Sequence, residues 1–180
     1  MKVLLHVCCG PCATWPFQAL EEEGLEADGF FYNPNIHPYR EYRARREGAE
    51  SLAGQSGRRL LTDAGYDMPE FFRLVAGRET DRCRLCYRLR LERTARAAAE
   101  RGYGAFTSTL LLSVHQRHGL VREEGEAAGA AAGIDFLYRD FRTGWKEHWA
   151  LTDRYRLYKQ QYCGCLYSEY ERFARAAGRS

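Results

Sequence analysis

Three short groups of cysteines, widely separated along the chain, constrain its fold more than any other feature. The 180-residue sequence contains seven cysteines. They are Cys8, Cys9 and Cys12, then Cys83 and Cys86, and finally Cys163 and Cys165. One metal or iron–sulfur site takes about four thiolates, so a fold that uses these cysteines as ligands must bring three distant segments together. Seven thiols exceed the need of one such site, which predicts a second metal or a redox pair.

The composition is that of a globular protein with a sizeable core. Hydrophobic residues make up 45% and charged residues 28% of the chain, and these values argue against disorder. The apolar run Val3-Leu4-Leu5 ends at His6, which makes it too short for a signal peptide or a membrane span. An odd cysteine count argues against a closed set of disulfides. We therefore expect one domain over residues 1–180, located in the cytoplasm with reduced thiols and without a membrane partner.

Arginine dominates the basic residues. Among the 27 lysines and arginines only Lys2, Lys146 and Lys159 are lysines, and the net charge is +3. Guanidinium groups bind phosphate in a bidentate manner and stack on bases, and the 12 tyrosines and three tryptophans add further stacking surfaces. These features suit an RNA partner. An arginine excess is also expected from a GC-rich genome, and composition alone favours that explanation.

Short apolar segments alternate with amphipathic ones along the whole chain. The pattern predicts strands over residues 1–7, 27–32, 58–62, 105–109 and 134–138. It predicts helices over residues 13–23, 39–55, 70–76, 83–101, 116–132, 145–157 and 168–177. Such alternation is typical of an α/β fold, here a single Rossmann-like domain with a mostly parallel sheet and helices on both faces.

Ligands of such folds bind at the carboxyl ends of the strands. The first cysteine group directly follows the first predicted strand, the Asn- and Pro-rich loop 33–38 follows the second, and residues 107–109 end the fourth. We expect these segments to converge on one edge of the sheet.

Each cysteine group also has a simpler interpretation. The Cys9-Gly10-Pro11-Cys12 segment, between a strand and a helix, is the arrangement of a thioredoxin-type dithiol oxidoreductase. The two later pairs together suit a structural Cys₄ zinc site, as in a zinc-stabilised RNA-binding protein. Cys8, which continues a buried strand, is compatible with a role as a small hydrophobic residue.

The three groups with their flanks resemble the epoxyqueuosine reductases of the QueH family. The matching segments are residues 6–12 (HVCCGPC), 32–38 (YNPNIHP), 82–91 (RCRLCYRLRL), 107–111 (TSTLL) and 162–165 (YCGC). The resemblance covers nearly the whole chain and implies an adenine-nucleotide-hydrolase-like form of the Rossmann-like fold. It implies a cobalamin-independent oxidoreductase that reduces epoxyqueuosine at the wobble position of a tRNA anticodon to queuosine, the last step of queuosine synthesis.

The resemblance also implies a [4Fe–4S] cluster beside an additional mononuclear iron, with zinc as a substitute in isolated protein. We expect the cluster to be held by Cys83, Cys86, Cys9 and one of Cys163 and Cys165. The second iron would take Cys8, Cys12 and the remaining C-terminal cysteine. The electron donor is not identified by the sequence.

Three residues are candidate proton donors for opening the epoxide. His37 lies in the loop that should face the site, Tyr162 precedes the third cysteine group, and Asp140 follows the last predicted strand. His37 is equally well suited to fixing its loop by a hydrogen bond to the backbone. Asp140 is also suited to capping the next segment.

The tRNA substrate gives a role to several polar residues. The candidates for substrate binding are Asn33, Asn35, Arg142, Arg154 and Arg156. Asparagine is also a common turn former, which favours a structural role for the first two. The arginines at positions 40, 43, 45 and 46 are further phosphate-binding candidates, although for Arg43 an i,i+4 ion pair with Glu47 is the better interpretation.

Overall fold

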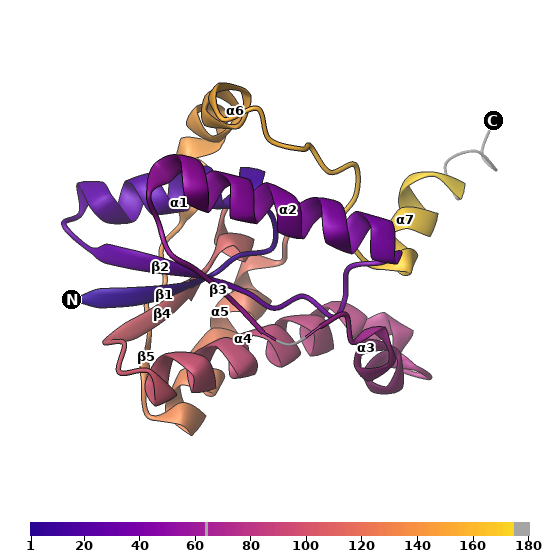
Figure 1. Ribbon diagram of the computed structural model, residues 1–180. Coiled ribbons are helices and arrows are strands. Elements are labelled where there is room, and N and C mark those ends of the chain that lie inside the picture. Colours follow the sequence, from indigo (N-terminus) through magenta and orange to yellow (C-terminus); the bar gives the residue numbers. More distant parts are fainter. Residues whose placement is uncertain (64, 175–180) are drawn as a thin grey trace.

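The core of the protein is a five-stranded, fully parallel sheet with strand order β3-β2-β1-β4-β5 (Figure 1). The computed structural model describes residues 1–63 and 65–174. The strands are β1 (Lys2–His6), β2 (Glu26–Phe31), β3 (Leu60–Thr62), β4 (Ala105–Ser108) and β5 (Asp135–Phe136). This sheet confirms the predicted α/β class.

Helices cover both faces of the sheet. They are α1 (Gly10–Glu22), α2 (Tyr39–Ser56), α3 (Met68–Val75), α4 (Arg82–Glu100), α5 (His118–Ala132), α6 (Trp145–Arg154) and α7 (Leu166–Arg172), with short 3₁₀ turns at Glu79–Asp81, Thr109–Leu111 and Phe141–Gly144. In Figure 1, α1, α2 and α6 lie on one side of the sheet and α3, α4 and α5 on the other. Two-sided cover explains why β1 is apolar throughout its middle, where Val3, Leu4 and Leu5 are fully buried.

The strand order creates a divergence point at the end of β1. From β1 the chain crosses by way of α1 to β2 on one side, whereas β4, its neighbour on the other side, is reached through α4. Loops after β1 and β4 therefore part from each other, and such divergence points form the ligand-binding crevices of open α/β sheets. The backbone N–H of Cys8 donates a hydrogen bond of 3.1 Å to Oγ1 of Thr109 across this point.

Helix α1 begins three residues before the predicted start, at Gly10 instead of residue 13. Pro11 is tolerated because the amides of the first turn have no partner within the helix. The earlier start makes Cys9 the N-cap residue and places Cys12 in the first turn. The thiols of Cys9 and Cys12 therefore both lie at the amino end of α1.

Other predicted bounds also differ from those observed. Strand β5 spans only Asp135–Phe136 instead of residues 134–138, because it pairs with β4 alone at the sheet edge. Helix α6 ends at Arg154 instead of at residue 157. Two residues after this end, Arg156 adopts a left-handed φ of 52°, which is incompatible with a continued α-helix. The predicted helix over residues 168–177 begins earlier, at Leu166, and its last three predicted residues lie outside the described part of the chain. No helix in the described part is long and apolar enough to cross a bilayer.

Gly10 permits a close approach between α1 and α2. A Cβ atom built on Gly10 would lie 2.5 Å from the carbonyl oxygen of Gly48.

Replacing Gly10 with Ala should force the helices apart and lower the free energy of unfolding of the metal-free protein by roughly 1–3 kcal/mol, measured by urea unfolding. The matched control is Gly54→Ala on α2, where a Cβ would meet nothing within 4 Å. Equal stability of the two variants would contradict this account.

Candidate metal centre

The first cysteine group forms a compact set of three thiols, called here the trio: Cys8, Cys9 and Cys12. Their Sγ atoms all lie within 4.8 Å of one another, and those of Cys8 and Cys9 are 3.8 Å apart. The trio lies between the carboxyl end of β1 and the amino end of α1. Unpaired amides and the helix dipole favour negative charge at that end of a helix. The location suits thiolates, which are the metal-binding form of cysteine.

The three thiols of the trio differ in acidity. Hydrogen bonds from the thiols of Cys12 and Cys9 lower the pKa of Cys8, and the Thr109 hydroxyl donates to the same sulfur at 3.3 Å. Burial raises the pKa of Cys9, and the hydrogen bond to Cys8 raises that of Cys12. The trio therefore favours the thiolate form at Cys8 more than at its two neighbours. A bound metal ion would replace the protons of the thiols that coordinate it.

The other four cysteines, called here the quartet, are Cys83, Cys86, Cys163 and Cys165. Cys86 and Cys165 belong to a small apolar cluster with Phe71, Val75 and Leu85. The pKa of Cys86 is raised to about 12, chiefly by burial and in part by the charges of the other three cysteines of the quartet. Cys163 is exposed. The mutual electrostatic effects of these four cysteines indicate that the fold brings the second and third cysteine groups near each other. Among the described residues, only the trio forms a close group of at least three potential metal ligands.

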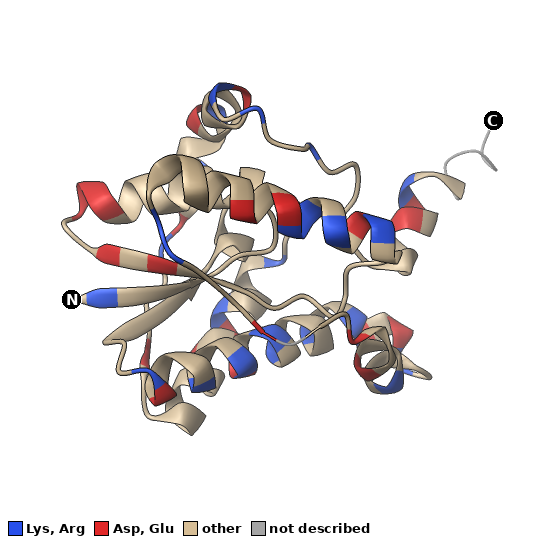
Figure 2. Cartoon of the chain, in the orientation of Figure 1, with Lys and Arg blue, Asp and Glu red and all other residues tan. Residues whose placement is uncertain are grey.

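Helix α2 carries alternating charges along its exposed side (Figure 2). Arg43 pairs with Glu47 at 3.5 Å and Arg46 with Glu50 at 2.8 Å. The i,i+4 interpretation of Arg43 is confirmed. Arg45 differs from both because it is only 2% exposed.

The side chain of Arg45 fixes the segment that carries the third cysteine group. Its Nη1 and Nη2 donate to the carbonyl oxygens of Cys163 at 2.7 Å and Tyr162 at 2.8 Å, and its Nε donates to Glu41 at 2.7 Å. The expectation that Arg45 contacts RNA phosphate is wrong, because a buried guanidinium with these partners has no access to a ligand on the surface.

His37 is not poised to donate a proton. Its Nε2 donates to the carbonyl of Pro34 at 3.0 Å, and its ring stacks on Phe72 with centroids 4.8 Å apart. Burial lowers the pKa of His37 to about 4, so the imidazole is neutral near pH 7. The backbone N–H of His37 also donates to the carbonyl of Gly164 at 2.8 Å. These contacts favour the loop-fixing role.

The other two candidate proton donors are engaged in structural contacts. The hydroxyl of Tyr162 donates to the carbonyl of His37, and burial raises the pKa of Tyr162 to about 12. The carboxylate of Asp140 accepts from the backbone N–H of Arg142 at 3.1 Å and from its Nε at 2.7 Å. Hydrogen bonds from Arg142 lower the pKa of Asp140. Asp140 is therefore an ionised cap, and the structure disfavours both residues as acids.

The substrate-binding candidates fall into two classes. Asn33 and Asn35 are buried, and Nδ2 of Asn33 donates to the carbonyl of Val7 at 2.9 Å. The Oδ1 atoms of both asparagines are buried and have no hydrogen-bond partner in the described part of the chain. Arg154 and Arg156 are exposed at and beyond the end of α6. The guanidinium of Arg142 is held by Asp140, as described above.

Two glutamines next to the cysteines were not anticipated. Nε2 of Gln160 donates to Sγ of Cys12 at 3.3 Å, and Nε2 of Gln116 donates to Sγ of Cys163 at the same distance. Oε1 of Gln160 is buried and, among described residues, has no partner. Neither glutamine belongs to a recognisable pattern in the sequence, because only tertiary folding brings it to a sulfur.

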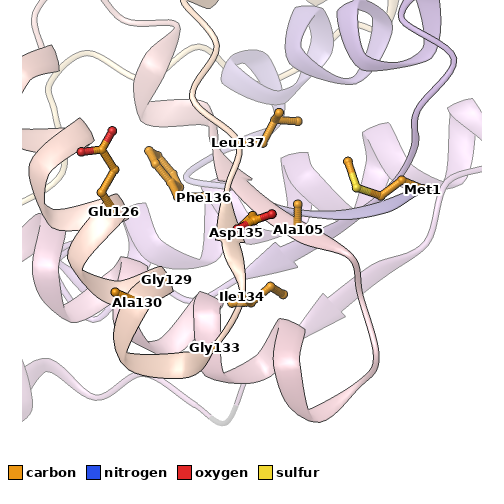
Figure 3. Close-up of a pocket in the computed structure, with 10 residues that line it drawn as sticks. All are labelled: Met1, Ala105, Glu126, Gly129, Ala130, Gly133, Ile134, Asp135, Phe136 and Leu137. Carbon is orange, nitrogen blue, oxygen red and sulfur yellow. The ribbon is translucent and has the colours of Figure 1, made fainter.

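A cavity of about 610 Å³ lies at the end of the sheet where the strands begin, opposite the end that carries the cysteines (Figure 3). It is lined by Met1, Ala105, Gly129, Ile134 and Phe136, among others. Met1 and Ile134 precede β1 and β5, and Ala105 begins β4, so the cavity is at the amino ends of the strands. The cysteines lie beyond the carboxyl ends. This cavity is therefore separate from the candidate metal centre.

Comparison with known proteins identifies the family. The family model described as epoxyqueuosine reductase QueH matches residues 3–171. The chain belongs to the QueH family. An epoxyqueuosine reductase QueH of Dehalococcoides mccartyi is 41% identical over 174 residues, covering 97% of this chain and 96% of the relative. The QueH of Thermotoga maritima is 33% identical over 180 residues, covering 94% of this chain and 91% of the relative. The resemblance found in the sequence is confirmed, and the family is one of oxidoreductases.

A solved structure shares the fold. It is described as a predicted subunit of a tRNA methyltransferase from Methanocaldococcus jannaschii, with a TM-score of 0.57 and 14% sequence identity. The match covers 85% of this chain and 76% of that one. At this identity the similarity supports the Rossmann-like architecture alone.

The role of Arg45 can be tested by hydrogen exchange. Arg45→Met removes the ion pair with Glu41 and the two hydrogen bonds to the backbone of Tyr162 and Cys163. Each of the latter two is worth about 1.5–3 kcal/mol, so amides of residues 162–166 should exchange at least about tenfold faster. The control is Arg43→Met on the exposed side of α2. Mass spectrometry of the metal-free proteins makes the comparison, and unchanged protection in Arg45→Met would show that other contacts hold the segment.

Proposed function

We propose that this chain reduces epoxyqueuosine at the wobble position of a tRNA anticodon to queuosine. The observation that carries the proposal is the close approach of three thiols at the carboxyl end of β1 in a chain of the QueH family. The electrostatic interactions of Cys86 with Cys83, Cys163 and Cys165 support a second group of thiols formed by the quartet. The reaction removes one oxygen, consumes two electrons and two protons, and releases water. An enzyme for it needs a store of electrons and a means of polarising the epoxide oxygen.

The thiols fit an iron–sulfur cluster together with a single iron. Metal–sulfur bonds of about 2.3 Å place the thiolates of one ion roughly 4 Å apart, which matches the spacing of the trio. The quartet offers the four thiolates of a [4Fe–4S] cluster. We therefore propose that Cys9 serves the single ion with Cys8 and Cys12, in place of the expectation from the sequence that Cys9 is a ligand of the cluster. When bound, such a centre supplies electrons and a Lewis acid, without cobalamin.

Residues of the chain would orient the substrate at this centre. The amide oxygens of Asn33, Asn35 and Gln160 are buried acceptors without partners in the described residues. Each lies close to a cysteine group: Asn33 bonds to the residue before Cys8, Gln160 bonds to Cys12, and Asn35 lies beside Gly164. Such acceptors suit hydroxyl or amine groups of a modified nucleoside, or a water that delivers a proton.

A dithiol oxidoreductase based on Cys9 and Cys12 is less well supported. Cys9 is 1% and Cys12 is 8% exposed, and the pKa of each is raised. A thiol that attacks disulfides needs an accessible sulfur and a lowered pKa. The second alternative is a zinc-stabilised RNA-binding protein. Metal analysis distinguishes it from the iron–sulfur reductase. A tRNA substrate places either protein in the cytoplasm, and a separate donor must supply the electrons of the reductase.

Metal analysis and activity test the proposal directly. Protein purified without oxygen should contain about five irons and four sulfides per chain and should convert epoxyqueuosine-containing tRNA when given a chemical reductant. Cys12→Ala should lower the iron content by about one, keep the sulfide, and abolish conversion. Stoichiometric zinc without sulfide after anaerobic reconstitution would support the RNA-binding alternative. Normal iron and activity in Cys12→Ala would refute the assignment of the trio.

We propose that Arg154 and Arg156 contact tRNA phosphates. Reversing both to Glu should raise the Michaelis constant for tRNA by about tenfold or more, and flatten its salt dependence, without loss of cluster absorbance. Reversing Arg96 and Arg122 makes the same change in net charge on exposed residues of α4 and α5 and serves as the control. If both double variants bind tRNA equally well, the patch has no role.

A further inference from the structure

Arg90 carries a positive charge in the protein interior without a carboxylate beside it. Its side chain is 2% exposed, and no ion pair joins it to an acidic residue within residues 1–63 and 65–174. Two neighbouring arginines of α4 are paired: Arg84 and Arg88 contact Glu124 at 2.7 and 2.8 Å. The buried Arg45 likewise has a carboxylate partner, as described above.

The contacts of Arg90 connect it to the cysteines. Its Nε donates to the carbonyl of Cys86 at 3.2 Å, and its guanidinium lies 5.9 Å from the ring centroid of Tyr87. Nη2 is buried and lacks a hydrogen-bond partner in the described part of the chain. The charge of Arg90 interacts with Cys86, Cys163 and Cys8, one residue from each cysteine group.

A guanidinium in this position needs nearby negative charge. Arginine stays protonated in proteins, and a buried ion without compensation costs several kcal/mol. Burial and Arg90 itself keep the neighbouring His6 neutral, with its pKa lowered to about 4. Burial raises the pKa of Tyr87, so its hydroxyl is neutral as well. The cysteines are the remaining groups around Arg90 that can become negative.

We infer that Arg90 is a positioning residue that supplies the fixed counter-charge of the metal–thiolate centre and makes that centre easier to reduce. The inference rests on the metal centre proposed above. A thiolate-bound cluster becomes more negative when it takes up an electron, so a fixed positive charge stabilises the reduced form more than the oxidised form. The spacing of Cys83, Cys86 and Arg90 places all three on one face of α4.

The reduction potential tests this role without the tRNA substrate. The measurement is a redox titration of anaerobic, iron-reconstituted protein, followed by electron paramagnetic resonance. Arg90→Gln should shift the midpoint to more negative potential, and Arg90→Lys, which keeps the charge, should remain near the wild type. Arg88→Gln removes an exposed charge two residues away and should change nothing. A wild-type potential in Arg90→Gln would overturn the inference.

Cobalt(II) binding provides a second readout in case a variant assembles no cluster. Binding of the ion to thiols that release their protons makes the site negative, so Arg90→Gln should weaken cobalt binding by about tenfold, judged by the thiolate charge-transfer absorbance. Arg90→Lys should restore it. Equal weakening in both variants would mean that the shape of Arg90 matters instead of its charge, which overturns the inference. If the wild-type protein binds cobalt but never forms an iron–sulfur cluster, the proposed reductase function is refuted. The comparison of cobalt binding between Arg90→Gln and Arg90→Lys then still decides the role of Arg90.

Discussion

The rest of the site depends on one constraint, the divergence of the loops at the carboxyl end of β1. Since β2 and β4 flank β1 and their following loops diverge, the trio has an open position at the amino end of α1. Side chains from both sides close it: Thr109 after β4 contacts Cys8, and Asn33 after β2 contacts the carbonyl of Val7. A site of this kind needs no dedicated metal-binding fold, because the ordinary topology of the sheet already supplies the space.

Charge is the second organising factor. Two arginines, Arg45 and Arg90, are buried around a set of thiols that burial alone would keep protonated. Arg45 binds backbone carbonyls and has a carboxylate partner, whereas Arg90 has no carboxylate partner within residues 1–63 and 65–174 and interacts with the charges of Cys86, Cys163 and Cys8. The interior is therefore arranged for thiolates bound to a cation and is poorly arranged for free thiols.

Sequence reasoning succeeded where periodicity and strand order decide the outcome. The alternation of segments predicted the parallel sheet, and the position of Cys8 after a strand predicted the edge where the cysteines meet. It failed where side-chain packing decides. The grouping of Cys9 with Cys8 and Cys12 depends on the helix starting at Gly10, three residues before the predicted start. The structural role of Arg45 arises from backbone partners in residues 162 and 163, more than a hundred positions away along the chain, which no local pattern reveals.

The third cysteine group lies near the end of the described chain, after all five strands. It reaches the centre only because α2 and the loop after β2 hold its backbone. A centre that requires Cys163 or Cys165 is therefore incomplete until almost the whole of this sequence has left the ribosome. The sheet can fold around the trio earlier in synthesis, so the order of translation separates formation of the scaffold from completion of the centre. Assembly of a cluster held by the quartet, as proposed above, would thereby be restricted to chains that have been synthesised through residue 165.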